Sequence, residues 1–354
     1  ERLHSSKADI FAAGFSGPNL VNSVMAAVID YKVVSQTKKD LRNSILVILL
    51  IILFFSFALY ILLSQQILNP VGKLVIGVEK VKQLDYHHKI DLLSENEFGV
   101  LAKSVNHTLE NFAELEIAKV VQEALLPEET LKTENFEVYG ATQPMHKLGG
   151  DYFDYFVNEE NVLHVFLADA AGHGVQAALM MAMAKSALLL ESASCKSGAD
   201  IMHSLNRTFF QLRQSSIKTM LTGQLLRFVK DKGFLINAGH CYPVVIDSDG
   251  NTLHEVEQGS YPLGYLLKRK FKESEFDFKP GSTIVLFTDG LIESLNSRNE
   301  PLGTEGFFQI LRDSYDHKLE KFYANIISRV KTWQCRQEDD LTIVLIRNNN
   351  ADIQ

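Results

Sequence analysis

The longest feature of the hydropathy pattern is an uninterrupted apolar run, ILVILLIILFFSFALYILL, from Ile45 to Leu63. It carries no charge, and Ser56 is its polar residue. A helix needs about 20 such residues to cross a bilayer, and a buried core helix rarely stays apolar on every face. The position of the run and the lack of a small-residue cleavage site exclude a signal peptide. We therefore expect a transmembrane helix over residues 44–66.

Two amphipathic helical segments follow this run. The first begins at Pro70 and repeats apolar residues at the a and d positions of a coiled coil. These residues are Val71, Leu74, Val78 and Val81. The second begins at a capping box of Ser94 and Glu97 and stops at Pro127. Its seam residues are Phe98, Leu101, Val105, Phe112 and Leu115.

Two such helices directly after a membrane helix resemble a HAMP signal-relay domain, which we expect over residues 67–117. The resemblance rests on Asn69-Pro70 and on NEFGVLAKSVN, and it implies that everything after Leu63 is cytoplasmic. Basic residues flank both ends of the apolar run, so the positive-inside rule does not decide the orientation. A linker helix over 107–126 would continue the relay and form a dimer seam. Residues 1–43 would be the remnant of an extracytoplasmic sensor region, because the chain begins at a glutamate.

From residue 136 onward, the pattern changes to short runs rich in branched and aromatic residues, as strands require. The runs are FEVYGAT, YFDYFV, VLHVFLAD, GQLLRFV, GFLINAG, TIVLFTD and LTIVLIR. Helical patterns lie between them, in VQAALMMAMAKSALLLESA and GFFQILRDSY. Most connections are short enough for antiparallel pairing. We therefore expect an α+β layered domain over residues 118–354.

Acidic residues stand at the ends of these runs. Asp169 and Asp289 each close a strand, whereas Asp151 opens one and the pair Asp339-Asp340 opens another. The end of one antiparallel strand and the start of its neighbour share a rim, so we expect these acids to meet at one edge. Each aspartate alone is more often a turn residue or a helix cap. Their matching positions favour a site, as do the adjacent glycines, which are Gly149, Gly150, Gly172, Gly174 and Gly290.

The chemistry of such a set is that of a hard metal site. Like-charged carboxylates repel one another unless a cation lies between them, and oxygen ligands without histidine or thiolate favour magnesium or manganese over zinc. We expect two ions, Mn²⁺ or Mg²⁺, about 4 Å apart, which would bind phosphate oxygens and activate a water. This arrangement indicates phosphate-ester hydrolysis without a covalent enzyme intermediate.

Composition excludes some other functions. The 354 residues include 35 basic and 43 acidic ones, for a formal net charge of -8. There is no basic stripe of the kind that a nucleic-acid partner requires. The cysteines, Cys195, Cys241 and Cys335, are scattered, which argues against a disulfide framework or a zinc site.

Six motifs resemble, in this order, one family of enzymes. They are LLPEE (125–129), LGGDYFDYF (148–156), ADAAGHGVQAALMMA (168–182), NAGH (237–240), FTDGLIES (287–294) and EDDLTIV (338–344). The set is similar to the SpoIIE-like, RsbU-type branch of the PPM metal-dependent serine/threonine phosphatases, over roughly residues 120–347. The resemblance implies a PPM-type αββα sandwich, in which two packed antiparallel sheets are flanked by helices.

The resemblance also implies roles for individual residues. Asp151, Asp169 and Asp289 would hold the dimetal centre, and Asp339 would complete it. The backbone carbonyl of Ala170 would be a further metal ligand. Asp340 is the less favoured member of its pair.

Other polar residues near these motifs have weaker assignments. Asp154 has at most a supporting role, and His173 either acts as a general acid or orients its loop. Asn237 and His240 suit a structural turn. Lys147 either touches substrate or is simply solvated, and Cys241 lacks an arranged base and suits a buried structural position.

Taken together, the resemblances imply a membrane-anchored, signal-regulated protein serine/threonine phosphatase. It would be a homodimer in the bacterial inner membrane, with its catalytic domain in the cytoplasm. Its substrate would be a phosphorylated STAS-type anti-sigma-factor antagonist of a partner-switching pathway. One alternative is a catalytically weak pseudophosphatase that docks a partner. Another is a diguanylate cyclase, because LGGDYFDYF resembles the GGDEF signature, but Tyr152 stands where that signature has its second acid.

Overall fold

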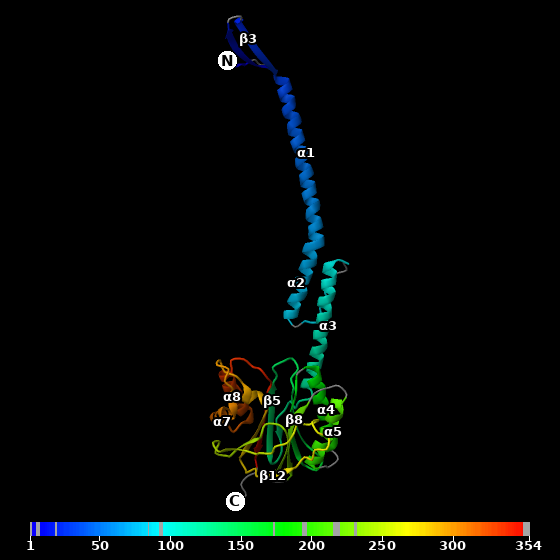
Figure 1. Cartoon of the computed structure of the whole chain (residues 1–354), viewed down its shortest axis with the longest axis vertical. Helices are drawn as coiled ribbons and strands as arrows, with labels where there is room; N and C mark the ends of the chain where they lie inside the picture. The colour runs from blue at the N-terminus through cyan, green and yellow to red at the C-terminus, as the bar shows by residue number, and fades with distance from the viewer. Residues whose placement is uncertain are drawn as a thin grey trace. The chain divides into compact units, whose positions relative to one another are not determined.

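The computed structural model describes two compact units, Glu1–Glu110 and Asn111–Gln354. Figure 1 shows the chain. The residues left undescribed are 1, 5–7, 18–19, 84, 92–94, 173, 193–196, 215–219, 230–231 and 350–354. The first unit begins with three antiparallel strands, for which the sequence pattern had predicted nothing. They are β1 (Arg2–His4), β2 (Ala8–Gly17) and β3 (Leu20–Asp30).

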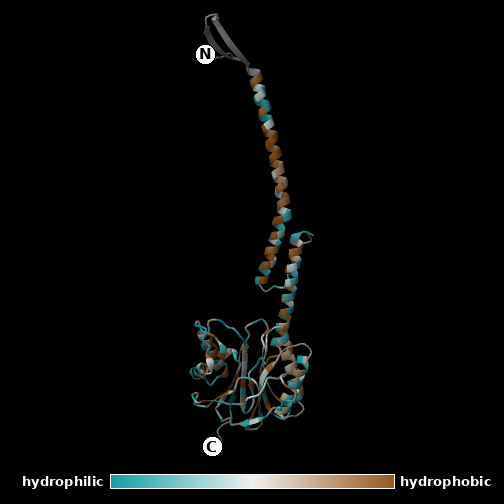
Figure 2. Ribbon diagram, viewed as in Figure 1, coloured by the Kyte–Doolittle hydropathy of each residue, from teal (hydrophilic) through white to brown (hydrophobic). Residues whose placement is uncertain are grey.

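A long helix, α1 (Tyr31–Leu63), contains the apolar run and begins well before it. A short π-helix, η1 (Ser64–Leu68), joins it to α2 (Asn69–Lys82). Figure 2 shows the run as an unbroken hydrophobic stretch of α1. Among the described residues, two helices are long and apolar enough to cross a membrane, and they differ in burial. The apolar window in the first, within 33–82, is 0% buried, whereas that of the second, Val175–Ser192, is 33% buried and belongs to a folded core.

The remainder of the first unit is a helix pair held by a small core. Leu74 of α2 is buried with Ile90 and Ala102, the last of which lies on α3 (Glu97–Glu123). The connector is fixed by Asn106, whose amide side chain accepts from the Ile90 N–H at 2.8 Å and donates to its carbonyl at 3.1 Å. Ser94 of the predicted capping box lies outside the described residues. The connector is therefore an ordered part of this unit where the structure describes it.

Two antiparallel sheets form the second unit. The order of the six-stranded sheet is β11-β10-β13-β14-β5-β4, and that of the five-stranded sheet is β12-β9-β8-β7-β6. The first sheet comprises β4 (Leu131–Lys132), β5 (Phe136–Gln143), β10 (Val244–Ile246), β11 (Leu253–Glu255), β13 (Thr283–Phe287) and β14 (Leu341–Asn348). The second comprises β6 (Asp151–Val157), β7 (Leu163–Ala170), β8 (Leu221–Val229), β9 (Lys232–Ala238) and β12 (Ser274–Phe276).

Helices cover the outer face of each sheet, as Figure 1 shows. Those on the five-stranded sheet are α4 (Val175–Ser192) and α5 (Gly198–Gln214). Those on the six-stranded sheet are α7 (Gly303–Ser314) and α8 (Leu319–Trp333). Strand alternation explains the layers, because Phe166 of β7 joins the helix-side cluster while its neighbours Val165 and Leu167 join the cluster between the sheets. The predicted αββα sandwich is confirmed.

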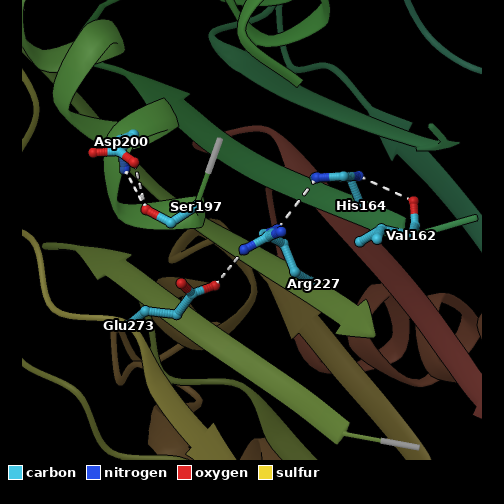
Figure 3. A network of polar contacts seen from close by, with 6 residues as sticks. All are labelled: Val162, His164, Ser197, Asp200, Arg227 and Glu273. Carbon is cyan, nitrogen blue, oxygen red and sulfur yellow. Dashed lines mark hydrogen bonds and ion pairs between the residues drawn. The ribbon is translucent and has the colours of Figure 1, made fainter. Parts of the chain in front are cut away.

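A polar network at the start of β7 links β7, β8 and the residue that precedes β12 (Figure 3). The Arg227 guanidinium donates from Nε to His164 Nε2 at 3.3 Å and from a terminal nitrogen to Glu273 at 2.7 Å. The start of α5 lies against this pair, since a Cβ on Gly198 would come within 2.8 Å of both Arg227 and Glu273. Because Asp169 lies near the other end of β7, this network stabilises the sheet at a distance from the acidic rim.

Candidate metal centre

The sheet register brings the predicted acids to one rim. Asp151, the first residue of β6, pairs directly with Asp169 near the end of β7. In the other sheet, Phe287 at the end of β13 lies opposite Ile343 of β14. Asp289, which follows β13, and Asp339, which precedes β14, therefore lie at the same end of that sheet. Four chain segments meet where their strands begin or end.

The acids influence one another electrostatically across the two sheets. Burial, together with the charges of Asp289 and Asp339, raises the pKa of Asp169 to about 7. Burial, followed by the charge of Asp169, raises the pKa of Asp151 well above its usual range. Burial and the charge of Asp289 also raise the pKa of Asp339. Such mutual perturbation is typical of carboxylates that share a functional site.

Two threonines orient the Asp151 carboxylate. The Thr288 hydroxyl donates to Asp151 Oδ2 at 2.8 Å, and the Thr342 hydroxyl donates to the same oxygen. Thr342 is completely buried and Thr288 is 1% exposed. Both threonines immediately neighbour the acidic motifs of β13 and β14. The bonds fix one oxygen of Asp151 within the protein and leave the other for a ligand.

Asp340 has a different set of partners from the other acids. Its carboxylate accepts from the backbone N–H groups of Met145 at 2.7 Å, Gly150 at 2.6 Å and Asp151 at 3.4 Å. Three backbone N–H groups therefore provide hydrogen bonds to the Asp340 carboxylate, and the residue is 5% exposed. Its role as a metal ligand stays a prediction, and its observed contacts are those of a residue that holds the loop before β6.

Glycine is required where the backbone comes closest to the acids. A Cβ on Gly150 would lie 2.8 Å from the carbonyl oxygens of both Ala170 and Gly172. A Cβ on Gly290 would lie 2.2 Å from the carbonyl oxygen of Asp340. Real Cβ atoms do not approach backbone oxygens so closely, so only glycine lets the segments carrying Asp151 and Asp289 reach their neighbours.

The donor set fits a hard divalent cation. In the described part of the chain, no three His, Cys, Asp or Glu side chains converge tightly enough to form a finished metal cage. The rim nevertheless offers carboxylate oxygens and the Ala170 carbonyl, which are the ligands that magnesium and manganese prefer. A cation there would also relieve the repulsion that raises the pKa values of Asp151 and Asp169.

Asp154, three residues after Asp151 on β6, contacts a tyrosine of its own strand and a lysine of α4. Its carboxylate accepts from the Tyr152 hydroxyl at 2.9 Å and lies 3.1 Å from the Lys185 ammonium. Lys185, on α4, also donates to the carbonyl of Leu125 at 2.6 Å, just beyond the end of α3. These contacts suit the supporting role predicted for Asp154.

The linker helix contacts the loop before β6 through its last turn. The Gln122 amide donates to the Gly149 carbonyl at 2.9 Å, next to the glycine that precedes Asp151. Lys147, in the same loop, lies 3.7 Å from the Glu116 carboxylate and over the Phe112 ring. In the structure, Lys147 contacts the linker helix.

The remaining predicted residues have structural partners. Asn237 and His240 exchange hydrogen bonds, side chain to backbone, in a closed turn. His240 Nδ1 lies 2.9 Å from the Thr222 hydroxyl, and burial lowers the pKa of His240 to about 4. Burial also raises the pKa of Cys241 to about 12, so this thiol is not a nucleophile near neutral pH. His173 lies outside the described residues.

The sequence reasoning missed Glu293, Thr288 and Thr342. Glu293 lies on the one-turn helix α6 (Gly290–Glu293), four residues after Asp289. Burial and the charges of Asp289 and Asp339 raise the pKa of Glu293, which places it beside the rim. The available signals were the spacing of four residues in TDGLIE and the threonine next to an acidic motif in TDG and DDLT.

Comparison with known protein families identifies two regions of the chain. The family described as Stage II sporulation protein E (SpoIIE) matches residues 159–349. The chain belongs to the SpoIIE family. A HAMP domain matches residues 62–114, so both resemblances found in the sequence are confirmed.

Individual relatives agree with this assignment. The chain is 25% identical over 270 residues to the phosphoserine phosphatase RsbU of Bacillus subtilis, and the match covers 74% of this chain and 80% of RsbU. It is 22% identical to RsbP of the same organism but spans only 53% of it. Among solved structures, the SiaA-PP2C domain of Pseudomonas aeruginosa aligns with a TM-score of 0.59 at 23% identity, covering 68% of this chain and 98% of that domain. The chain is a phosphatase of the PPM type with a HAMP domain, and the family depends on divalent metal.

Proposed function

We propose that this protein is a membrane-anchored, signal-regulated protein phosphatase that hydrolyses phosphoserine and phosphothreonine. The observation that carries this proposal is the rim itself, where Asp151 and Asp169 face each other in register and Asp289 and Asp339 lie at the matching end of the other sheet. A phosphatase that uses no covalent intermediate needs such a set of oxygen ligands.

In this proposal, Asp151, Asp169, Asp289 and Asp339 hold two Mn²⁺ or Mg²⁺ ions, together with the Ala170 carbonyl. When bound, the ions supply an activated water and charge neutralisation for the phosphate oxygens. The chain itself supplies orientation. Thr288 and Thr342 hold the Asp151 carboxylate in one orientation, and Asp340 holds the loop that leads into β6.

The proposed membrane anchor is the apolar run, with a span over 44–66 and a sensor remnant over 1–43. The HAMP relay over 67–117 and the phosphatase over 118–354 would then lie in the cytoplasm of a bacterial cell. Support comes from the HAMP match and from the uncovered apolar side chains of α1. A bilayer stabilises a helix whose side chains are apolar on every face.

The proposed regulation acts through the last turn of α3. A cleft of about 330 Å³ separates this turn from β5 and reaches Asp151, with Gln122, Leu126 and Gly149 in its wall. Gln122 donates a hydrogen bond to the Gly149 carbonyl. Lys185 forms an ion pair with Asp154 of β6 and donates a hydrogen bond to the segment that follows the helix. A shift of the helix end would therefore displace the start of β6 and with it the Asp151 carboxylate.

The proposed substrate is a phosphorylated STAS-type anti-sigma-factor antagonist. It rests on the motif resemblance and on the similarity to RsbU, which is a phosphoserine phosphatase. Fold alone does not select a substrate, so this part of the proposal needs its own test with the phosphorylated protein.

The first test is hydrolysis of p-nitrophenyl phosphate by the full chain in detergent, with Mn²⁺, with Mg²⁺ and with EDTA. We expect activity that needs a divalent ion and falls at least about 100-fold in Asp289→Asn, since each lost 1.4 kcal/mol of transition-state stabilisation costs tenfold. The matched control is Asp313→Asn, at an exposed carboxylate of α7 that lies 3.8 Å from Arg329. Wild-type protein that binds Mn²⁺ weakly and stays inactive would instead support a pseudophosphatase.

A further inference from the structure

The loop between β11 and β12 carries an unusual combination of side chains. Four large apolar or aromatic residues are between 42% and 49% exposed: Tyr261, Tyr265, Leu266 and Leu267. Residues 261–272 also contain four basic and no acidic residues, which are Lys268, Arg269, Lys270 and Lys272. We call residues 261–272 the basic aromatic loop. Its positive charge contrasts with the net charge of -8 of the whole chain.

The backbone of this loop is held firmly while its side chains are displayed. The Asn206 side chain on α5 donates to the Leu266 carbonyl and accepts from the Gly264 N–H, both at 2.9 Å. Leu263 and Phe271 anchor the loop in the core, at 0% and 6% exposure. A partner would therefore not have to order the loop, which is one of the main costs of binding.

Aromatic rings and guanidinium groups alternate across the surface. The rings of Tyr261 and Tyr265 stack with centroids 5.6 Å apart. Arg269 lies 5.0 Å from the centroid of Tyr261, and Arg213 of α5 lies 5.5 Å from that of Tyr265. Among the described residues, no carboxylate forms an ion pair with the basic side chains of the loop. Rigid aromatics beside arginine are enriched at protein-binding surfaces.

The loop shares the rim with the catalytic acids. Leu263 forms an antiparallel bridge with Leu221, with N–H to carbonyl distances of 2.8 and 3.4 Å. Leu221, the first residue of β8, pairs in turn with Ala170. Two strand spacings, roughly 10 Å, therefore separate the loop backbone from the proposed ligand carbonyl. A phosphorylated protein bound at the rim would reach this loop with the residues around its phosphoserine.

We infer that the basic aromatic loop docks the protein substrate by binding an acidic and partly apolar surface that flanks the phosphoserine. This inference rests on the proposed phosphatase function and adds the chemistry of its substrate. The lysines and arginines complement acidic residues of the substrate, and the tyrosine and leucine side chains provide apolar contact area. An anionic membrane surface is the rival partner for a basic and apolar loop, but the position on the catalytic rim favours the substrate.

The test compares two phosphoserine peptides on the full chain in detergent. One has aspartate and glutamate around the phosphoserine, and the other has asparagine and glutamine at the same positions. We expect Lys268→Glu/Lys270→Glu to lower kcat/KM on the acidic peptide roughly tenfold, because two attractive charge pairs become repulsive. The matched control is Lys318→Glu/Lys331→Glu, which makes the same charge change at exposed positions at and beside α8. Hydrolysis of p-nitrophenyl phosphate should be unchanged in both variants.

Fluorescence anisotropy of the labelled acidic peptide reads docking without catalysis. We expect the loop variant to bind it roughly tenfold more weakly than the wild type and the control. A second variant, Leu266→Ala/Leu267→Ala, tests the apolar contacts and should weaken the binding of both peptides equally.

The outcomes separate the two proposals. A wild type that binds the acidic peptide but hydrolyses nothing would refute the phosphatase and keep the docking loop. An active wild type for which Lys268→Glu/Lys270→Glu changes kcat/KM equally on the two peptides would overturn the docking inference. A variant that loses binding only to phosphatidylglycerol vesicles would assign the loop to the membrane surface instead.

Discussion

At the scale of single residues, the acidic rim depends on side chains that reach no substrate. Asp151 would offer one oxygen to a cation only if the other is held, and two threonine hydroxyls hold it. The Thr342 hydroxyl also lies 2.7 Å from that of Thr142 on β5. Residues of β14 and β5, together with Thr288 just after β13, therefore contribute to the orientation of one carboxylate, which is how partners of metal ligands ordinarily act.

Replacing Thr342 by valine tests this role. The valine keeps the shape of the side chain but leaves Asp151 Oδ2 with one hydroxyl donor instead of two. We expect the affinity for Mn²⁺, measured by titration calorimetry on the full chain, to fall about 10- to 100-fold. Thr342→Ser restores the hydroxyl and should restore most of the affinity. Unchanged Mn²⁺ binding in the valine variant would show that Thr288 alone orients Asp151.

At the scale of elements, the sequence predicted the strands of the sandwich and the acids at their ends. Apolar alternation and turn residues reveal where strands begin and end, and so reveal that Asp169 and Asp289 close strands. The antiparallel pairing of neighbouring strands then followed from short connections. The shared rim was therefore predictable without knowledge of the register.

Other features depended on contacts between distant segments. The register that sets Asp151 opposite Asp169 depends on packing against α4 and α5, which no local pattern encodes. The role of Asp340 was hidden because its donors lie 189 to 195 residues away. The strands β2 and β3 were missed because alanine and glycine, which are depleted in strands, interrupt their branched and aromatic residues.

The network at the start of β7 gives the five-stranded sheet a pH dependence. Burial and the neighbouring Arg227 guanidinium lower the pKa of His164 to about 4, against about 6.5 in an unfolded chain. Between those values, the unfolded chain binds a proton that the folded sheet does not. His164 therefore lowers the stability as the pH falls from about 6.5 to about 4, by up to about 1.4 kcal/mol per pH unit.

The substitution His164→Gln removes this titration and keeps a donor and an acceptor. We expect the variant to be less stable than the wild type at pH 7, and the gap in unfolding midpoint to narrow towards pH 4.5. The single tryptophan of the chain, Trp333 at the end of α8, reports unfolding of the sandwich by fluorescence. A gap that stays constant over this range would mean that His164 has the same pKa in the folded and the unfolded chain.

At the scale of the whole molecule, apolar side chains on the relay helices point to self-association. Val71 and Val78 of α2 belong to the predicted seam, yet they are 40% and 49% exposed in the single chain. Leu74, on the same seam, is buried against Ile90. Further exposed apolar residues lie on α3, at Ile117, Val120 and Val121. A second copy of the chain that packs along the α2 seam would cover Val71 and Val78, as in a coiled coil.

Introducing a charge on this seam should break the proposed homodimer. Val78→Glu would place an unpaired carboxylate between helices, and burying such a charge is costly. We expect the dimer of the full chain in detergent, measured by light scattering after size-exclusion chromatography, to weaken at least about tenfold. The matched control is Ile76→Glu, at an α2 position that is 57% exposed but off the a–d seam. Equal dissociation in both variants would place the interface elsewhere on α2, and a stable dimer in both would place it outside the relay. Loss of the dimer in Val78→Glu alone would identify the seam as the surface through which the relay helices pair.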